Sequence, residues 1–168
     1  MELKELTEKT LKLFDAKNTK ELIQNIPKHF NDENNMAAFE KMVNDLSIDW
    51  LQKIFQYYEA DRKDKKQDYT PTTVARLMGT LCDDNEIIDM CAGSGALTIQ
   101  KWDLNHDIKV QCYELDKKVI PILLYNLSIR NIEGKVFQVD ILQNEIYDVW
   151  TLTKGERYSK INHDISNK

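Results

Sequence analysis

The sequence predicts an α/β protein in which a parallel sheet with crossover helices follows a helical region. Two observations support this prediction. Through the first 60 or so residues, apolar side chains recur at helical spacing. From residue 86 onward, strand-like segments alternate with helical ones, which is typical of a parallel sheet. With 168 residues, the chain has room for one domain, or for a small domain with an extension.

Four helices are expected in the N-terminal region. Asn18 and Glu21 are spaced like a capping box at the start of the second helix, and Pro27 ends or kinks it. Ser47 is expected to be the N-cap of the fourth helix. At helical spacing, the apolar stripes are interpreted as core rather than as a ligand-binding surface. Their members are Leu3, Leu6, Leu13, Phe14, Leu22, Ile23, Ile26, Met36, Phe39, Met42, Val43, Ile48, Leu51, Ile54, Phe55 and Tyr58.

A polar, charge-dense joint at 59–68 separates this region from the rest of the chain. We therefore expect a helical region at 1–66, a sheet-forming core at 67–153 and a polar tail without strand pattern at 154–168. Pro71 suits the first turn of the helix after the joint. One side of that helix carries Val74, Leu77, Met78 and Leu81.

Four strands are expected in the core, with helices after the first and the second. The helix from about Lys117 to Arg130 is apolar almost all round, so it is expected to be well buried. The expected strands are 86–90, 109–113, 135–139 and 146–152.

The loop after the first strand is the first indication of function. Residues 86–100 read as an apolar strand, an acid at its end (Asp89), a small-residue loop and a helix. Gly93, Ser94 and Gly95 occupy the loop, where glycine permits unusual backbone angles and a close approach to a ligand. The order strand, glycine loop and helix predicts a nucleotide-type cofactor site.

Two acids at the ends of later strands extend this prediction. Glu114 follows Gly95 by about 20 residues, the spacing at which a carboxylate binds the ribose of a nucleotide. The alternative interpretation of Glu114 is a solvated strand-end acid. Asp140 ends the third strand, where it can accept a hydrogen bond from an adenine amino group, and Ile141 and Leu142 can flank the ring.

Composition and charge restrict the function classes. The net charge is −5, and neither half of the chain carries the basic excess of an independent nucleic-acid binder. No apolar run is long enough to span a bilayer, and the N-terminus does not resemble a signal peptide. The three cysteines lack CxxC spacing, so neither a disulfide framework nor a metal site is expected. We expect a cytoplasmic protein without a membrane partner.

Four segments together resemble a known family. "DYTP" (68–71), "DMCAGSG" (89–95), "YELD" (113–116) and "VDI" (139–141) have the order and spacing of adenine-amino DNA methyltransferases. The resemblance is closest to the modification subunits of type I restriction systems, and it covers about residues 48 to 150. A nicotinamide-binding Rossmann protein fits less well, because "AGSGAL" lacks the full GxGxxG pattern.

The resemblance implies S-adenosylmethionine as the cofactor. Tyr69, Thr70 and Pro71 would hold its methionine end. Asp89, Cys91, Gly93, Ser94 and Gly95 would form the loop under it. Glu114 would bind the ribose, and Asp140 with Ile141 the adenine.

The resemblance also implies a sheet order. A Rossmann-like class I methyltransferase sheet places the fourth strand beside the first, so about four parallel strands are expected in the order 3-2-1-4. The fourth strand would then have an open edge. Open edges invite pairing with another chain, and we expect a homodimer or a heteromeric contact through residues 146–152. The alternative is that the polar tail folds back over this edge.

One motif of the family is absent from these 168 residues. No Asn/Asp/Ser-Pro-Pro-aromatic motif follows the fourth strand, and no proline occurs after Pro121. That motif holds the amino group of a flipped adenine toward the methyl donor. We therefore expect cofactor binding without methyl transfer by this chain alone, and DNA contact only with a partner subunit. The alternatives are an inactive regulatory or partner subunit, and a small-molecule or RNA methyltransferase with a different catalytic loop.

Overall fold

The computed structural model describes residues 2–58 and 70–164. The helices and strands alternate as the sequence predicts, with one additional strand. The elements are α1 (Leu3–Leu13), α2 (Thr19–Asn25), the 3-10 helix η1 (Ile26–His29), α3 (Glu33–Val43), α4 (Trp50–Tyr58), α5 (Thr72–Leu81), β1 (Glu86–Asp89), α6 (Ala96–Leu104), β2 (Lys109–Glu114), α7 (Ile120–Ile129), β3 (Glu133–Asp140), β4 (Glu145–Thr153) and β5 (Lys160–His163).

The five strands form one mixed sheet in the order β1-β2-β3-β4-β5. β1, β2 and β3 are parallel, as predicted. The predicted position of the fourth strand is wrong: β4 lies beside β3, not beside β1, and runs antiparallel to it. The sheet is therefore neither all parallel nor ordered 3-2-1-4.

The short connection between β3 and β4 explains this difference. Only residues 141–144 join the two strands, whereas a parallel crossover needs about a dozen residues or more. The Asn144 N–H donates to the Ile141 carbonyl at 3.3 Å, and Asn144 has a φ of 53°. These residues form a tight turn, so the chain returns along β3 as a hairpin.

β5 is the element that the sequence analysis missed. Residues 160–163 pair antiparallel with 150–153 of β4, in the segment expected to be a polar tail. β5 joins to the helices as well, because the Asn31 side chain accepts from the Ile161 N–H at 2.7 Å and donates to its carbonyl at 3.0 Å. β5 is short and half polar, so no apolar alternation marks it.

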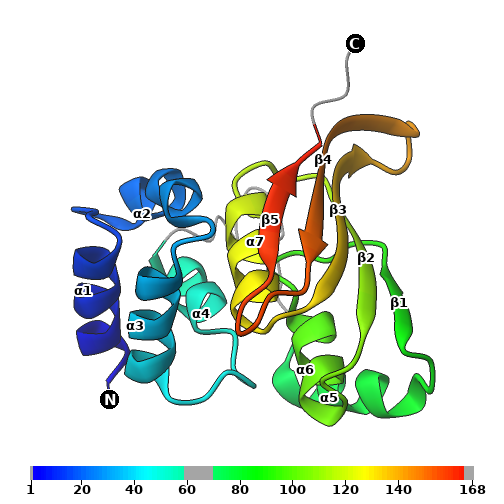
Figure 1. The fold of residues 1–168 in the computed structure, drawn as a ribbon, viewed down its shortest axis with the longest axis horizontal. Coiled ribbons are helices and arrows are strands. Elements are labelled where there is room, and N and C mark those ends of the chain that lie inside the picture. Colours follow the sequence, from blue (N-terminus) through cyan, green and yellow to red (C-terminus); the bar gives the residue numbers. More distant parts are fainter. Residues whose placement is uncertain (1, 59–69, 165–168) are drawn as a thin grey trace.

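α7 lies between the sheet and the N-terminal helices, and this position explains why it is apolar almost all round (Figure 1). One side of α7 places Ile122, Tyr125 and Ile129 in a hydrophobic cluster with α1–α4. Its other side places Leu123, Leu124 and Leu127 in a second cluster with the sheet. The predicted burial of this helix is therefore confirmed, and the N-terminal helices share a core with α7.

Helix capping in the N-terminal region agrees with the prediction at one position and differs at another. The Asn18 side chain accepts from the Glu21 N–H, as expected for an N-cap. The expected cap at Ser47 is wrong, because its hydroxyl donates to Asp45 at 2.7 Å. Asp49 accepts from the Gln52 N–H at 2.8 Å and so caps α4.

α5 packs on α6 through small residues rather than through its apolar stripe. Gly79 approaches the Lys101 backbone so closely that a Cβ would lie 3.3 Å from it, and Ala75 is fully buried. The predicted stripe on the other side of α5 is exposed in the part of the chain described here. Its members are Val74, Leu77, Met78 and Leu81.

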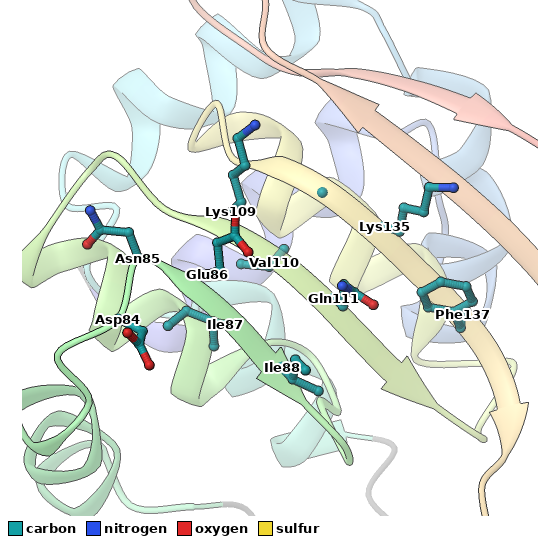
Figure 2. A pocket seen from close by; sticks show the side chains of 11 residues that line it. Asp84, Asn85, Glu86, Ile87, Ile88, Lys109, Val110, Gln111, Lys135 and Phe137 are labelled. Carbon is teal, nitrogen blue, oxygen red and sulfur yellow. The ribbon is translucent and has the colours of Figure 1, made fainter.

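The sheet face opposite α6 and α7 is open among the described residues. Val110, Cys112 and Val136 are buried on the helix side, whereas Ile88, Gln111 and Lys135 are exposed on the other side. Figure 2 shows these three side chains on the open face, where they line a hollow of about 880 Å³. None of the helices in 2–58 and 70–164 is long and apolar enough to cross a membrane.

Candidate cofactor-binding site

Three carboxylates lie at one edge of the sheet. Asp89, Glu114 and Asp140 are the last residues of β1, β2 and β3. These strands are parallel, so their carboxyl ends reach the same edge, which is where open α/β sheets bind ligands. The structure therefore places the three acids predicted from the sequence at the same end of the sheet.

The glycine loop after β1 has a left-handed backbone, which glycine adopts without the steric cost that a Cβ brings. Gly93 has a φ of 55° and Gly95 a φ of 97°. The Gly95 N–H donates to the Ala92 carbonyl at 2.8 Å, which closes a tight turn before α6. A Cβ at Gly93 would meet no heavy atom of residues 2–58 and 70–164 within 4 Å, so the loop borders open space in this part of the chain. This open side fits a cofactor that lies against the backbone.

Glu114 joins the glycine loop to the end of β2. Its Oε2 accepts from the Gly93 N–H at 2.8 Å, and its Oε1 accepts from the Asp116 N–H at 2.7 Å. The Ala92 N–H also donates to the Tyr113 carbonyl at 3.0 Å. Each carboxylate oxygen keeps a second lone pair, so Glu114 can accept from a ligand hydroxyl while it holds the loop.

Asp89 has a more internal position. It is buried, and one of its carboxylate oxygens accepts from the Thr98 hydroxyl at 3.1 Å. Burial raises the pKa of Asp89, and the Thr98 hydrogen bond opposes that shift. Asp89 therefore fastens the first turns of α6 to the end of β1.

Asp140 shapes the turn between β3 and β4. Its Oδ1 accepts from the Gln143 N–H at 3.0 Å, which leaves Oδ2 for other contacts. Ile141 is half-buried beside it, and Leu142 is 95% exposed.

The remaining predicted residues differ in exposure. Thr70, Pro71 and Cys91 are exposed, whereas Ser94 is buried. Thr70 and Pro71 precede α5, and Tyr69 lies outside the described residues. Ser94 presents its carbonyl to the Asn126 side chain at 2.9 Å.

Two exposed apolar side chains beside these acids were not selected from the sequence. Met90 follows Asp89 and is 48% exposed, and Leu115 follows Glu114 and is 54% exposed. The sequence signal that could have identified Met90 and Leu115 is their position directly after a strand-end acid. A ligand with an apolar or aromatic ring would find contact surface there.

The end of β4 lies far from this edge. Because β4 runs antiparallel to β3, Leu152 pairs with Gly134 near the start of β3. Trp150 stacks on His163 with ring centroids 5.1 Å apart, and the Tyr158 hydroxyl donates to Glu40 at 2.6 Å. Neither aromatic ring is available at the three-carboxylate edge.

The described residues do not assemble a metal site. Within 2–58 and 70–164, no three His, Cys, Asp or Glu side chains gather as ligands of one ion. Cys112 is buried, and burial raises the pKa of its thiol far above the ordinary value. This thiol is therefore protonated at neutral pH.

A model of a known protein family matches most of this chain. The family model described as N-6 DNA methylase matches residues 44–155, which include the glycine loop, all three strand-end acids and the start of α4. No curated protein and no solved structure matched the chain.

Proposed function

Since the chain belongs to the N-6 DNA methylase family, we propose that it binds S-adenosylmethionine at the carboxyl ends of β1, β2 and β3. The observation that carries this proposal is the hydrogen bond between Gly93 and Glu114, which joins a left-handed glycine loop to a strand-end carboxylate. This combination suits a nucleoside ligand, because backbone can approach it closely while a carboxylate accepts from its ribose.

Each part of the site has a distinct role in this proposal. Glu114 accepts from the ribose hydroxyls, and Asp140 with Ile141 contacts the adenine. The loop around Gly93 lies under the amino-acid end of the cofactor, with Tyr69, Thr70 and Pro71 closing that side. When bound, the cofactor supplies a methyl group on a sulfonium ion.

We propose further that methyl transfer to DNA adenine needs groups that these 168 residues do not supply. The Asn/Asp/Ser-Pro-Pro-aromatic motif is absent from the sequence, and the strand where it was expected ends at the opposite edge of the sheet. A net charge of −5 also favours DNA contact through a partner subunit. A regulatory subunit that binds the cofactor without transferring its methyl group is the second candidate, supported by the same position of β4.

Calorimetry with S-adenosylmethionine and with its demethylated product tests the binding proposal. Glu114→Ala is expected to lower affinity by about 1.5–3 kcal/mol, the range for a hydrogen bond to a charged group. Glu133→Ala is the matched control, because Glu133 lies on the same sheet at the start of β3, paired with Lys109 at 3.1 Å. It should bind like the unchanged protein. If the unchanged protein binds neither S-adenosylmethionine nor its demethylated product at millimolar concentration, the proposal is wrong.

A further inference from the structure

We infer that Asn126 and Asp49 are positioning residues that hold the glycine loop in place. Through these two residues, the N-terminal helical region influences the affinity for the cofactor. The inference rests on the proposed cofactor binding and adds two residues that lie behind the loop. A continuous series of hydrogen bonds runs from Ser94 in the loop, through Asn126 on α7, to Asp49 at the start of α4.

Asn126 holds the loop from inside the protein. Its Nδ2 donates to the Ser94 carbonyl at 2.9 Å and to Asp49 Oδ1 at 2.9 Å. Its Oδ1 accepts from Arg130 Nη1 at 3.3 Å. The amide therefore has one orientation, because a flip would turn its oxygen toward a carbonyl and a carboxylate. With Asn126 2% exposed, water cannot replace these bonds.

Asp49 is fixed in place by the helix that it caps and by a buried cation. Its Oδ1 also accepts from the Gln52 N–H at 2.8 Å. Arg130 donates to the carbonyls of Leu46 at 2.8 Å and Ile48 at 3.1 Å, so the residues just before Asp49 are held to α7. Burial raises the pKa of Asp49 and lowers that of Arg130 to about 10, while the attraction between the two charges opposes both shifts.

The same N-terminal segment also contacts the helix that follows the loop. Gln100 on α6 donates its Nε2 proton to the Ser47 carbonyl at 2.7 Å, and Gln100 is buried. Residues 46–49 therefore bond to α7 and α6, and through Asn126 to the loop that precedes α6. The N-terminal region therefore holds the loop in place at two points, through Asn126 on α7 and through Gln100 on α6.

Two polar atoms in this cluster are buried without a hydrogen-bond partner among the described residues. They are Ser94 Oγ and Asp49 Oδ2. The Ser94 hydroxyl opposes the effect of burial on Asp49 and lowers the pKa of its carboxyl group. Such buried polar atoms are costly to leave unpaired. The loop and the start of α4 therefore face each other through polar groups, not through apolar packing.

The test compares two buried asparagines. Asn126 lies on α7, and Asn35 forms a hydrogen bond with a residue of α7. Asn126 contacts the loop, whereas Asn35 accepts from the Tyr125 hydroxyl at 2.8 Å and donates to the Leu13 carbonyl at 3.1 Å, with no bond to the loop among the interactions of the described residues. Asn126→Ala and Asn35→Ala both remove a buried amide and both should lower the unfolding temperature. Only Asn126→Ala should alter the loop.

We expect Asn126→Ala to weaken binding of the demethylated cofactor about tenfold, because this variant loses the one hydrogen bond from Asn126 to the loop itself. Hydrogen–deuterium exchange without ligand should speed up at the amides of residues 93–96. Asp49→Asn, which keeps the size of the side chain, should produce the same two changes more weakly and serves if Asn126→Ala does not fold. Asn35→Ala should leave affinity and exchange at 93–96 unchanged.

Equal effects of Asn126→Ala and Asn35→Ala on affinity and on loop exchange would overturn the inference. If the unchanged protein does not bind the ligand, the proposed function fails by itself. Loop exchange in the ligand-free variants then still decides whether Asn126 and Asp49 position the loop.

Discussion

The Gly93 N–H donates to Glu114 Oε2 at 2.8 Å, which joins the loop after β1 to the end of β2. The second oxygen of Glu114 accepts from the Asp116 N–H at 2.7 Å. One carboxylate therefore stabilises two turns at the edge where the cofactor is proposed to bind. A change at Glu114 affects loop shape and ligand contact together, whereas the loop glycines allow these effects to be separated.

Alanine replacements of the two loop glycines should differ in their effect on stability. Gly93→Ala is expected to lower the free energy of unfolding by about 1–2 kcal/mol, the cost of a left-handed backbone for a residue with Cβ. Gly95→Ala should cost more, because its Cβ would also lie 3.1 Å from Leu123 Cδ1. Urea unfolding measures both values.

The same pair distinguishes ligand contact from folding. The Cβ of Gly93→Ala would point into space that the described residues leave open beside the loop. This variant should therefore lose cofactor affinity although it is the more stable of the two. A Gly93→Ala protein that binds the cofactor normally would contradict the position proposed for the ligand.

Asp89 should make folding depend on pH. Burial raises its pKa in the folded state above the value of 3.8 that applies to an ordinary aspartate. As pH rises past that value, the unfolded chain releases this proton first, so the folded state loses stability until Asp89 ionises as well. The asparagine of Asp89→Asn has no proton to release, so this variant does not show the loss of stability that Asp89 causes.

The measurement is the difference in unfolding free energy between Asp89→Asn and the unchanged protein at several pH values from 4 to 7. As pH rises, the unfolding free energy of Asp89→Asn should increase relative to that of the unchanged protein. A difference that stays constant, or that moves in favour of the unchanged protein, would show that the pKa of Asp89 is not raised.

The purified chain should not methylate adenine in DNA. Transfer requires acceptors that hold the amino group in place, and the family motif that supplies them is absent from the sequence. A tritium-labelled cofactor incubated with DNA should leave no label on adenine above background. Label on adenine that disappears in Glu114→Ala would contradict this prediction.

The free edge of β4, where a partner contact is expected through residues 146–152, is shorter than the sequence predicts. β5 pairs with 150–153 of β4, so only the first half of β4 lacks a neighbour on that side in the described chain. Ile146 is 55% exposed and Tyr147 is 42% exposed there. We expect self-association at micromolar concentration in light scattering, and Ile146→Lys should reduce it. A monomer of 19.7 kDa for both proteins would contradict a homodimer.

The position of the fourth strand is the point at which the resemblance to the family predicts the wrong topology. The family pattern places the fourth strand beside β1, but residues 141–144 are too few for the crossover that this position requires. Asp140, just before this connection, and Asn144, its last residue, are residue types typical of turns. The length of this connection was therefore the sequence signal for a hairpin, and the prediction of a crossover overlooked it.

The sequence by itself determined the helices, the three parallel strands and the acids at their ends. These features follow from local periodicity, from spacing and from the direction of the chain, so Glu114 and the glycine loop could be brought together in advance. Only the tertiary structure decided which atoms meet behind the loop. Asp49 and Asn126 are far apart in the sequence, and their hydrogen bond exists because α7 packs between the sheet and the N-terminal helices. Such a contact depends on how whole helices pack, and no local pattern of residues encodes it.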